Sequence, residues 1–231
     1  MQDLLIFHRN LRIEDNAALY NASLNQDYSS VFIFDKEYWS QSDRSVNQLK
    51  FALDSLNELE LELKKFNVNL YVFEGSLRDF ASYMNQNHPN SNLHMNHTTE
   101  TEYFSRNLKA LKQNFSLSVN QYKDFGIQIT NQNRDCWASD WQNYMKSETY
   151  KIPLVSKKFK TMNLPKFSEF KNYVNNYSGH IQKGGTISGK GLLTSFLEKR
   201  CKGYSKKMSN PSDAVIACSR LSPHIAFGTL S

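Results

Sequence analysis

The sequence predicts an α/β fold in which five parallel strands form a doubly wound, Rossmann-like sheet with helices on both faces. Short apolar runs alternate with amphipathic stretches through residues 3–121, and parallel neighbours need crossover connections of this kind. Hydrophobic residues make up 39% of the 231-residue chain and the mean hydropathy is −0.61. This is enough apolar material for a buried core, and it excludes a wholly disordered or collagen-like chain.

Each expected strand is a short apolar run bounded by polar or turn-forming residues. The expected strands are residues 3–8, 30–35, 69–74, 92–96 and 117–121. The expected helices are residues 15–24, 49–63, 77–87 and 100–115. Glu14 or Asp15 is expected to accept the first backbone N–H groups of the first helix. In the second helix, Glu60 and Lys64 are expected to form an i,i+4 pair on its outer side.

Ligands of such a sheet bind beyond the carboxyl ends of the strands, where the strand order reverses. The polar residues that follow the expected strands are His8, Arg9, Asn10, Asp35, residues 74–76, Asn96 and His97. No G-x-G-x-x-G motif follows the first strand, so the sequence carries no dinucleotide fingerprint. The topology predicts a pocket without naming its occupant.

Charge divides the chain into an acidic first part and a basic second part. Residues 1–150 hold 14 Lys and Arg against 19 Asp and Glu, a net −5, whereas residues 151–231 hold 14 against 3, a net +11. A polyanion is one partner for such a basic part, and a solvated face is the alternative. Lysines and aromatic residues alternate within it: Lys157, Lys158, Phe159, Lys160, Lys166, Phe167, Phe170, Lys171 and Tyr173. This pattern suits either DNA binding or a linker clamped to the acidic part by its aromatic rings.

Cysteine and histidine spacing gives little support for a metal site. The three cysteines are too far apart for a metal knuckle or a redox pair, which favours a reduced, cytoplasmic protein: Cys136, Cys201 and Cys218. A spacing that could hold zinc occurs at His94, His97 and Glu100. Histidines three residues apart converge only on a helix, and this segment is an expected strand end, so rim or surface histidines are favoured. The first apolar run, residues 4–7, is too short to span a membrane and no signal-peptide cleavage site follows it.

A glycine-rich segment at residues 184–191 nearly spells a phosphate-binding P-loop. Gly191 stands where a Ser or Thr would hold Mg²⁺, so a flexible linker leading into a helix is favoured. That helix is expected at residues 191–200, with Gly203 just past its end.

Two further segments each allow two interpretations. Trp137, Trp141 and Tyr144 share one helix face, which indicates aromatic packing onto the sheet or, alternatively, a base-stacking or chromophore role. Near the carboxyl end of the chain, the hydroxyls of Ser219 and Ser222 suit a phosphate or pyrophosphate at a helix start. A capped helix after a turn would show the same pattern.

Three segments, in order along the chain, resemble the DNA photolyase/cryptochrome family. Residues 7–19 resemble its opening signature, R-x-L-R-x-x-D-N-x-A-L. Residues 31–35 and the helix through Leu63 resemble its second strand and helix. Residues 185–204 and 219–223 resemble the start of its flavin-binding domain. The resemblance implies an α/β domain at residues 1–135, a linker at 136–185 and the truncated start of an all-helical FAD-binding domain at 186–231.

The resemblance also carries ligand residues onto this sequence. Tyr204 matches the tyrosine beside the flavin, and the phosphate-binding T-S-x-L-S segment is matched by Ser219, Leu221 and Ser222. Cys218 stands where that segment has Thr, which replaces a hydroxyl by a weaker thiol donor. An antenna chromophore (a folate, a deazaflavin or a flavin) is implied in the α/β domain, with Arg12, Asp35 and Lys50 expected to line its site.

The function implied is that of a monomeric, blue-light-dependent deoxyribodipyrimidine photolyase, which repairs UV-damaged duplex DNA through FAD. The family's remaining flavin contacts lie further along than Ser231. The chain is therefore expected to be a truncated form without catalytic residues of its own or a metal. Two alternatives stay open: a cryptochrome-type photoreceptor, and a non-catalytic antenna- or nucleotide-binding module.

Overall fold

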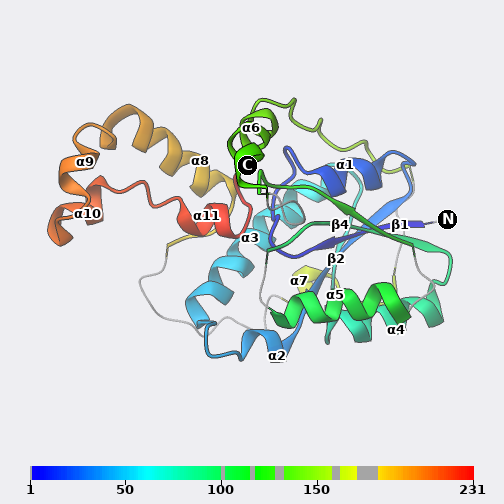
Figure 1. Cartoon of the computed structure of the whole chain (residues 1–231). Helices are drawn as coiled ribbons and strands as arrows, with labels where there is room; N and C mark the ends of the chain where they lie inside the picture. Colours follow the sequence, from blue (N-terminus) through cyan, green and yellow to red (C-terminus); the bar gives the residue numbers. More distant parts are fainter. Residues whose placement is uncertain (1, 100–101, 115–117, 128–132, 158–161, 171–181) are drawn as a thin grey trace.

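The computed structural model describes residues 2–99, 102–114, 118–127, 133–157, 162–170 and 182–231. Its centre is one five-stranded sheet, in which every neighbouring pair is parallel and the order is β3-β2-β1-β4-β5. The strands are β1 (Gln2–Phe7), β2 (Tyr28–Phe34), β3 (Leu70–Glu74), β4 (Ser91–Asn96) and β5 (Ser118–Tyr122). The predicted parallel, doubly wound sheet is confirmed (Figure 1).

Helices cover both faces of the sheet because successive side chains of each strand point to opposite faces. Leu5 and Phe7 of β1 pack with α1 (Ala17–Ser23) and α3 (Val46–Lys64), whereas Leu4 and Ile6 pack with α4 (Leu77–Asn87) and α5 (Glu102–Asn114). Two hydrophobic cores result, one on each face. A short helix, α2 (Lys36–Trp39), follows β2.

The polar details of two helices differ from the prediction. Asn16, not Glu14 or Asp15, caps α1, because its side-chain oxygen accepts from the Leu19 amide at 3.1 Å. Asp15 instead takes a left-handed backbone, with φ +48°. On α3, the predicted pair with Lys64 forms at 3.4 Å, but Glu60 is buried rather than on the outer side. The reason is tertiary: a later segment covers Glu60, and its Oε1 accepts from the Ser168 amide at 3.2 Å.

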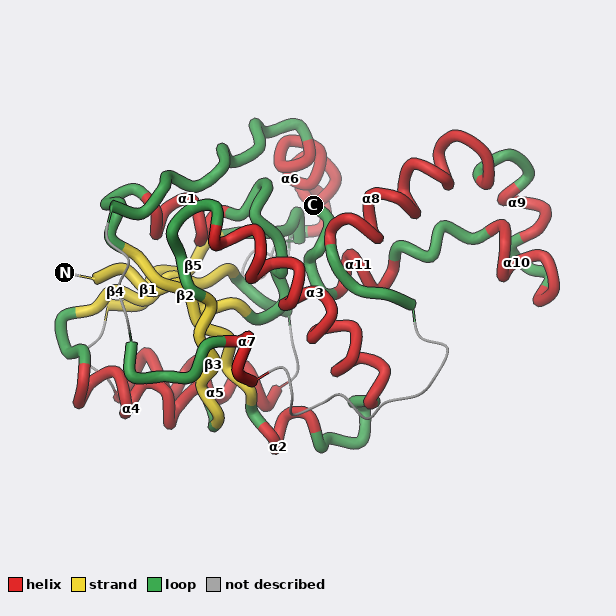
Figure 2. The backbone as a smooth tube through the Cα atoms, turned by 180° about the vertical axis from the view of Figure 1, so that it is seen from behind, coloured by secondary structure: helices red, strands yellow, loops and turns green. Residues whose placement is uncertain are grey.

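Residues 150–157 and 162–170 run along the sheet domain and are bound to it. The Val72 amide donates to the Pro165 carbonyl at 2.9 Å, and Tyr71 forms an antiparallel bridge with Lys166, so this segment lies along β3 (Figure 2). In α7 (Phe167–Phe170), both terminal phenylalanines are buried in the core beneath α3. These two rings support the clamped-linker interpretation over base stacking. Residues 158–161 and 171–173 of the Lys/aromatic pattern lie outside the described residues.

The tryptophan-bearing helix α6 (Arg134–Met145) does not bury its aromatic face. Trp137 is 51% exposed and Trp141 is 41% exposed, so the predicted packing onto the sheet is wrong. Trp141 lies over Gly126 in the loop after β5, where an added Cβ would come within 2.7 Å of the indole ring. This helix therefore packs on a loop rather than on the strands.

The last fifty residues form a helical arm and a return segment (Figure 1). The arm consists of α8 (Thr186–Ser195), one turn of π-helix η2 (Phe196–Arg200), α9 (Tyr204–Lys207) and α10 (Pro211–Ala217). The chain then returns to the sheet domain through α11 (Ser222–Ala226). The predicted helix starts earlier than residue 191, at Thr186. Gly189 lets α8 pack closely on α11, since an added Cβ there would lie 2.8 Å from Nδ1 of His224. No helix among the described residues is long and apolar enough to cross a membrane.

Candidate functional site

A crevice of about 670 Å³ opens beyond the carboxyl ends of β1, β4 and β5. The strand order reverses at β1, since β2 and β3 lie on one side of it and β4 and β5 on the other. The crevice is also bounded by α6 and by the returning residues 225–231. It therefore occupies the place where the sequence predicts a ligand.

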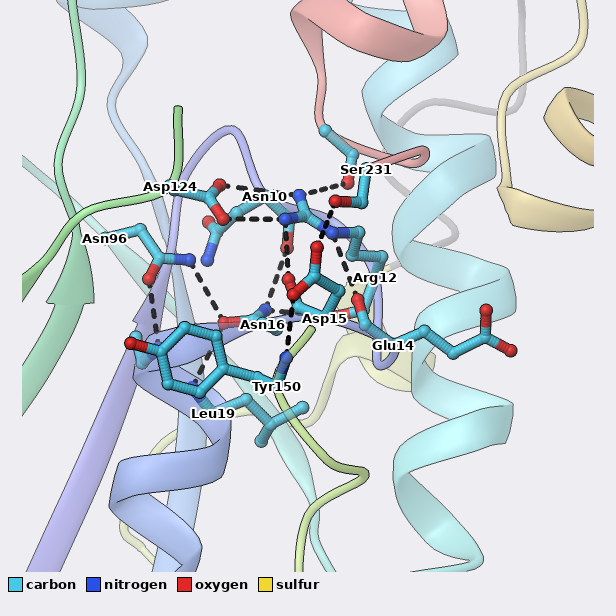
Figure 3. Close-up of polar contacts among 12 residues, drawn as sticks. Asn10, Arg12, Glu14, Asp15, Asn16, Leu19, Asn96, Asp124, Tyr150 and Ser231 are labelled. Carbon is cyan, nitrogen blue, oxygen red and sulfur yellow. Dashed lines mark hydrogen bonds and ion pairs between the residues drawn. The ribbon is translucent and has the colours of Figure 1, made fainter. Parts of the chain in front are cut away.

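The guanidinium of Arg12 holds the walls of this crevice together. It is buried and all of its nitrogens donate: Nε to the Glu14 carbonyl at 3.1 Å, Nη2 to the Asp15 carbonyl at 2.7 Å, and Nη1 to the Gly228 carbonyl at 3.2 Å. Nη1 and Nη2 also form a two-pronged pair with Asp124, with the shorter contact at 2.6 Å (Figure 3). Arg12 thus ties the loop after β1 to the end of β5 and to the returning segment.

Burial raises the pKa of the Asp124 carboxyl, and the adjacent Arg12 guanidinium opposes this rise. Burying a carboxylate without a counter-charge costs free energy, and the Arg12 guanidinium supplies that counter-charge to Asp124. His97 lines the same crevice, and burial, together with Lys112 and Lys123, lowers its pKa. The imidazole of His97 is accordingly neutral near pH 7.

Asparagines fix the loop between β1 and α1 against the end of β4. Asn96 accepts from the Ala18 amide at 3.0 Å and donates to the side-chain oxygen of Asn16 at 3.0 Å. Asn16 in turn donates to the backbone oxygens of Asn10 and Arg12. The loop that carries the polar residues of the crevice is therefore rigidly positioned before any ligand arrives.

Asn10 has a side-chain donor without a hydrogen bond to the described part of the chain. Asn10 is only 3% exposed, and its Oδ1 accepts from the His8 amide at 3.2 Å. Its Nδ2 is buried and has no hydrogen-bond partner among the described residues. Buried donors are normally paired, and this one has no acceptor among the described residues.

The three predicted antenna residues lie in three different places. Arg12 lines the large crevice, but its donors are directed to protein acceptors. Asp35 lines a neighbouring apolar cavity of about 30 Å³ and caps α2 through the amides of Glu37 and Tyr38. Lys50 pairs with Asp54 on α3 and lines neither cavity. Asn10, which was predicted only as one of several polar residues at this edge, is the residue with an open donor.

The smaller cavity contains a histidine that stays neutral. His8 lies with its ring 5.5 Å from that of Tyr38, edge to face. Burial, and then the charges of Arg9 and Arg44, lowers the pKa of His8 to about 3. This imidazole is therefore uncharged over the physiological pH range.

The other histidine pattern forms a polar network across the sheet instead of a metal site. Nε2 of His94 lies 3.0 Å from Asp3 Oδ1, and its Nδ1 lies 2.9 Å from the Tyr122 hydroxyl. Glu100 lies outside the described residues, and no metal-ligating cluster occurs within the described ones. His94 therefore joins β1, β4 and β5.

The glycine-rich segment is docked rather than flexible. Gly184 and Gly185 are buried against α3, and the Gly185 amide donates to Ser55 Oγ at 3.0 Å. Lys190, at the lysine position of the near P-loop, binds the Glu14 carboxylate at 2.7 Å. The start of α8 is thus occupied by groups of the protein itself.

The predicted flavin residues lie on the helical arm. Tyr204 begins α9 and packs edge to face on Phe196 at 5.5 Å. The segment Cys218, Ser219, Leu221 and Ser222 connects α10 to α11. Arg220 in its middle adopts a left-handed backbone with φ +63°. Exposed cations lie earlier on the same arm: Lys199, Lys202, Lys206 and Lys207.

Comparison with known proteins gives one family. The sequence model of the family described as DNA photolyase matches residues 4–124. A (6-4) DNA photolyase of Arabidopsis thaliana is 37% identical over 83 residues, which span 31% of this chain and 15% of the relative. Cryptochrome-1 of Aedes aegypti is 34% identical over 83 residues, spanning 33% of this chain and 15% of the relative.

Solved structures show the same fold. An archaeal photolyase from Sulfolobus tokodaii, determined with two FAD molecules, superposes with a TM-score of 0.75 at 23% identity. A cryptochrome of Synechocystis gives 0.72 at 17% identity. Both superpositions cover 100% of this chain and 53% of the solved one, so the chain spans about half the length of these structures.

Proposed function

Because this chain belongs to the DNA photolyase family, we propose that the protein is a blue-light-dependent photolyase that repairs pyrimidine dimers in DNA. The observation that carries the proposal is the family match, which covers the sheet domain from β1 to the end of β5. FAD, when bound, would supply the light-driven electron that splits the dimer, while the protein binds, orients and shields the reactants. No residue of this chain is proposed to be catalytic.

The flavin is proposed to contact the arm. Tyr204 offers an aromatic face, and Ser219 and Ser222 offer hydroxyl donors to the phosphates. Leu221 and Cys218 complete the segment, with the thiol as the weaker donor. The exposed lysines of the arm favour an anionic ligand, and the chemistry of this donor set fits a pyrophosphate group.

An antenna chromophore is proposed in the large crevice. Its volume of about 670 Å³ suits a heterocyclic ligand. Asn10 would donate to a carbonyl or ring nitrogen of that ligand through its open Nδ2. Arg12 would hold the crevice walls in place, and Asp35 would line the adjoining cavity. Lys50 lines neither cavity and would not contact the chromophore. Folates, deazaflavins and flavins all have acceptors of the required kind.

DNA is the proposed macromolecular partner of the basic part. Phe167 and Phe170 are buried and cannot stack on bases. The cations of the arm remain exposed, and they can neutralise backbone phosphates: Lys199, Lys202, Lys206, Lys207 and Arg220. A photoreceptor is the second candidate, because cryptochromes stand beside the photolyase among the relatives.

The test combines DNA binding with repair. Duplexes with and without a pyrimidine dimer are titrated with the 231-residue chain at low and physiological salt. Salt-sensitive binding that ignores the dimer is expected, since counterion release dominates. The protein expressed from its whole reading frame is then illuminated with blue light under reducing conditions. Loss of dimers supports the photolyase, and unchanged dimers with a bound flavin support the photoreceptor.

A further inference from the structure

The guanidinium of Arg200, at the end of η2, binds two separate segments of the arm. Nε donates to Ser195 Oγ at 3.0 Å, and Nη2 donates to the Leu192 carbonyl at 2.7 Å. On the other side, Nη1 donates to the Cys218 carbonyl and Nη2 also donates to the Ser219 carbonyl at 3.3 Å. One side chain thus joins the end of α8 to the loop that follows α10.

Beside Arg200, the Gln182 side chain also holds this loop, since its Nε2 donates to the Arg220 carbonyl at 2.6 Å, but apolar contacts are few. Within α10, Ala217 is the one buried residue, and η2 and α9 bury none of their described side chains. Hydrophobic packing therefore does not fix the position of Cys218 and Ser219. The hydrogen bonds from Arg200 do so, and a planar guanidinium is suited to several fixed acceptors at once.

The same side chain also touches the other part of the proposed flavin site. The Arg200 guanidinium lies 5.7 Å from the centre of the Phe196 ring, which packs edge to face against Tyr204. Arg200 therefore connects Tyr204, through Phe196, with the Cys218–Ser222 segment. It lies in a single π-helical turn, in which the Cys201 amide donates back to the Phe196 carbonyl at 2.8 Å. Such turns occur often at functional sites.

The acceptors that Arg200 uses on this loop are carbonyl oxygens. The hydroxyls of Ser219 and Ser222 are not used by these bonds. A cation whose donors are bound to carbonyls also leaves positive potential next to the loop, as does Arg220. Both effects favour a phosphate ligand at this loop.

We propose that Arg200 is a positioning residue for the flavin site, which holds the Cys218–Ser222 segment in the geometry that binds the flavin phosphates. This inference rests on the proposed function, because it requires that the segment bind flavin. Arg200 itself does not touch the ligand. The two parts of the site would lose their relative position without it.

The test uses isotope-labelled 231-residue chain titrated with FAD and followed by amide NMR. In the wild-type chain, the amides of Ser219, Leu221 and Ser222 are expected to shift at millimolar FAD. Arg200→Lys keeps the charge but cannot bind four acceptors, and we expect about tenfold weaker binding, the loss of roughly one charged hydrogen bond. Lys183→Ala, which removes an exposed charge at the start of the arm, is the matched control and is expected to change the affinity less than about twofold.

The outcomes separate the two proposals. Equal FAD affinity in wild type and Arg200→Lys would overturn the positioning role while leaving the flavin site intact. An affinity loss in Lys183→Ala as large as that in Arg200→Lys would reduce the effect to general charge and would also overturn it. If FAD shifts none of these wild-type amides, the flavin site itself fails.

Hydrogen exchange on the ligand-free chain then tests the clamp by itself. Faster exchange at residues 218–221 in Arg200→Lys, with unchanged exchange in β1, supports the clamp. Unchanged exchange at those residues contradicts it. Ser195→Ala removes only one of the Arg200 hydrogen bonds, so exchange at residues 218–221 is expected to rise by less than in Arg200→Lys. This graded response would distinguish loss of the clamp from unfolding of the arm.

Discussion

The sheet domain and the helical arm are held by different forces. Leu56 of α3 and Phe80 of α4 are completely buried, one in each core. On the arm, Leu197 is 63% exposed and Ile216 is 73% exposed. The sheet domain is therefore stabilised by apolar burial within itself, whereas the arm is positioned by polar contacts.

Those polar contacts lie where the arm meets the sheet domain. At its start, Glu58 of α3 accepts from the Ile187 amide at 2.8 Å, next to the Ser55 bond described above. At the return, Arg12 binds the Gly228 carbonyl. Single polar substitutions are therefore expected to shift the position of the arm. A large loss of stability in the sheet domain is expected only when a buried apolar side chain is truncated or the buried ion pair is removed.

The largest effect is expected from Arg12→Ala, because Arg12 belongs to both regions. It leaves the Asp124 carboxylate buried without its counter-charge and releases Gly228. Breaking a buried pair costs about 3–5 kcal/mol of unfolding free energy. Urea unfolding measures the loss, with the exposed Lys109→Ala as the control. A loss similar to that of the control would show that the pair is not needed at the junction.

A slightly smaller effect is expected from Leu56→Ala, which leaves a cavity beneath the sheet. The unfolding free energy should fall by about 2–5 kcal/mol. The matched arm variant Leu197→Ala should change it by less than about 0.5 kcal/mol. Both are measured by urea unfolding followed by circular dichroism. Similar losses in the two variants would contradict the division into a cored domain and an uncored arm.

The sheet domain should also lose stability as the pH falls. The pKa of His8 is lowered to about 3 in the folded chain, so the unfolded chain binds the proton first. Its stabilising contribution is complete above the unfolded value of 6.5 and is lost as the pH falls toward 3, at a slope of up to about 1.4 kcal/mol per pH unit. Groups such as Asp124, whose carboxyl pKa is raised by burial, are common to wild type and His8→Asn, so the difference between the two proteins isolates His8. Between pH 6.5 and 5, the urea midpoint of His8→Asn should therefore change less with pH than that of wild type.

The smallest effect is expected from Glu58→Ala, which removes the cap on the first turn of α8. The Ile187 amide should exchange about fivefold faster, in line with a cap worth about 1 kcal/mol. Amides of β1 should be unchanged. Glu148→Ala, an exposed carboxylate outside this contact, serves as the control. Equal protection of Ile187 in wild type and Glu58→Ala would mean that the arm does not depend on this contact.

The sequence predicts the five strands and their parallel arrangement because apolar periodicity is a local property. The errors at Glu60 and Trp137 come from long-range contacts, whereas the error at the cap of α1 is local and is one or two residues in size. The sequence predicts Glu60 on the outer side of its helix, because no residue close to it in sequence indicates that Ser168 covers it. The exposure of Trp137 likewise depends on how α6 meets the loop after β5.

The candidate site was predictable in location but not in roles. The topology predicts a crevice at the strand ends, and Asn10 and Arg12 lie in it. The sequence could not show that every nitrogen of Arg12 is used by the protein while Asn10 keeps an open donor. Arg200 was missed altogether, since its partners Cys218 and Ser219 are 18 and 19 residues away.

The bridge between Tyr71 and Lys166 has a consequence for association between molecules. An uncovered outer strand presents a row of amide and carbonyl groups that can pair with a strand of another chain, a common route to aggregation. Here Pro165 supplies a carbonyl to β3 but has no N–H group to offer outward, and Lys166 adds a charge at the same place. The segment therefore blocks strand addition at this edge of the sheet, and a chain cut before residue 162 would expose that edge to other molecules.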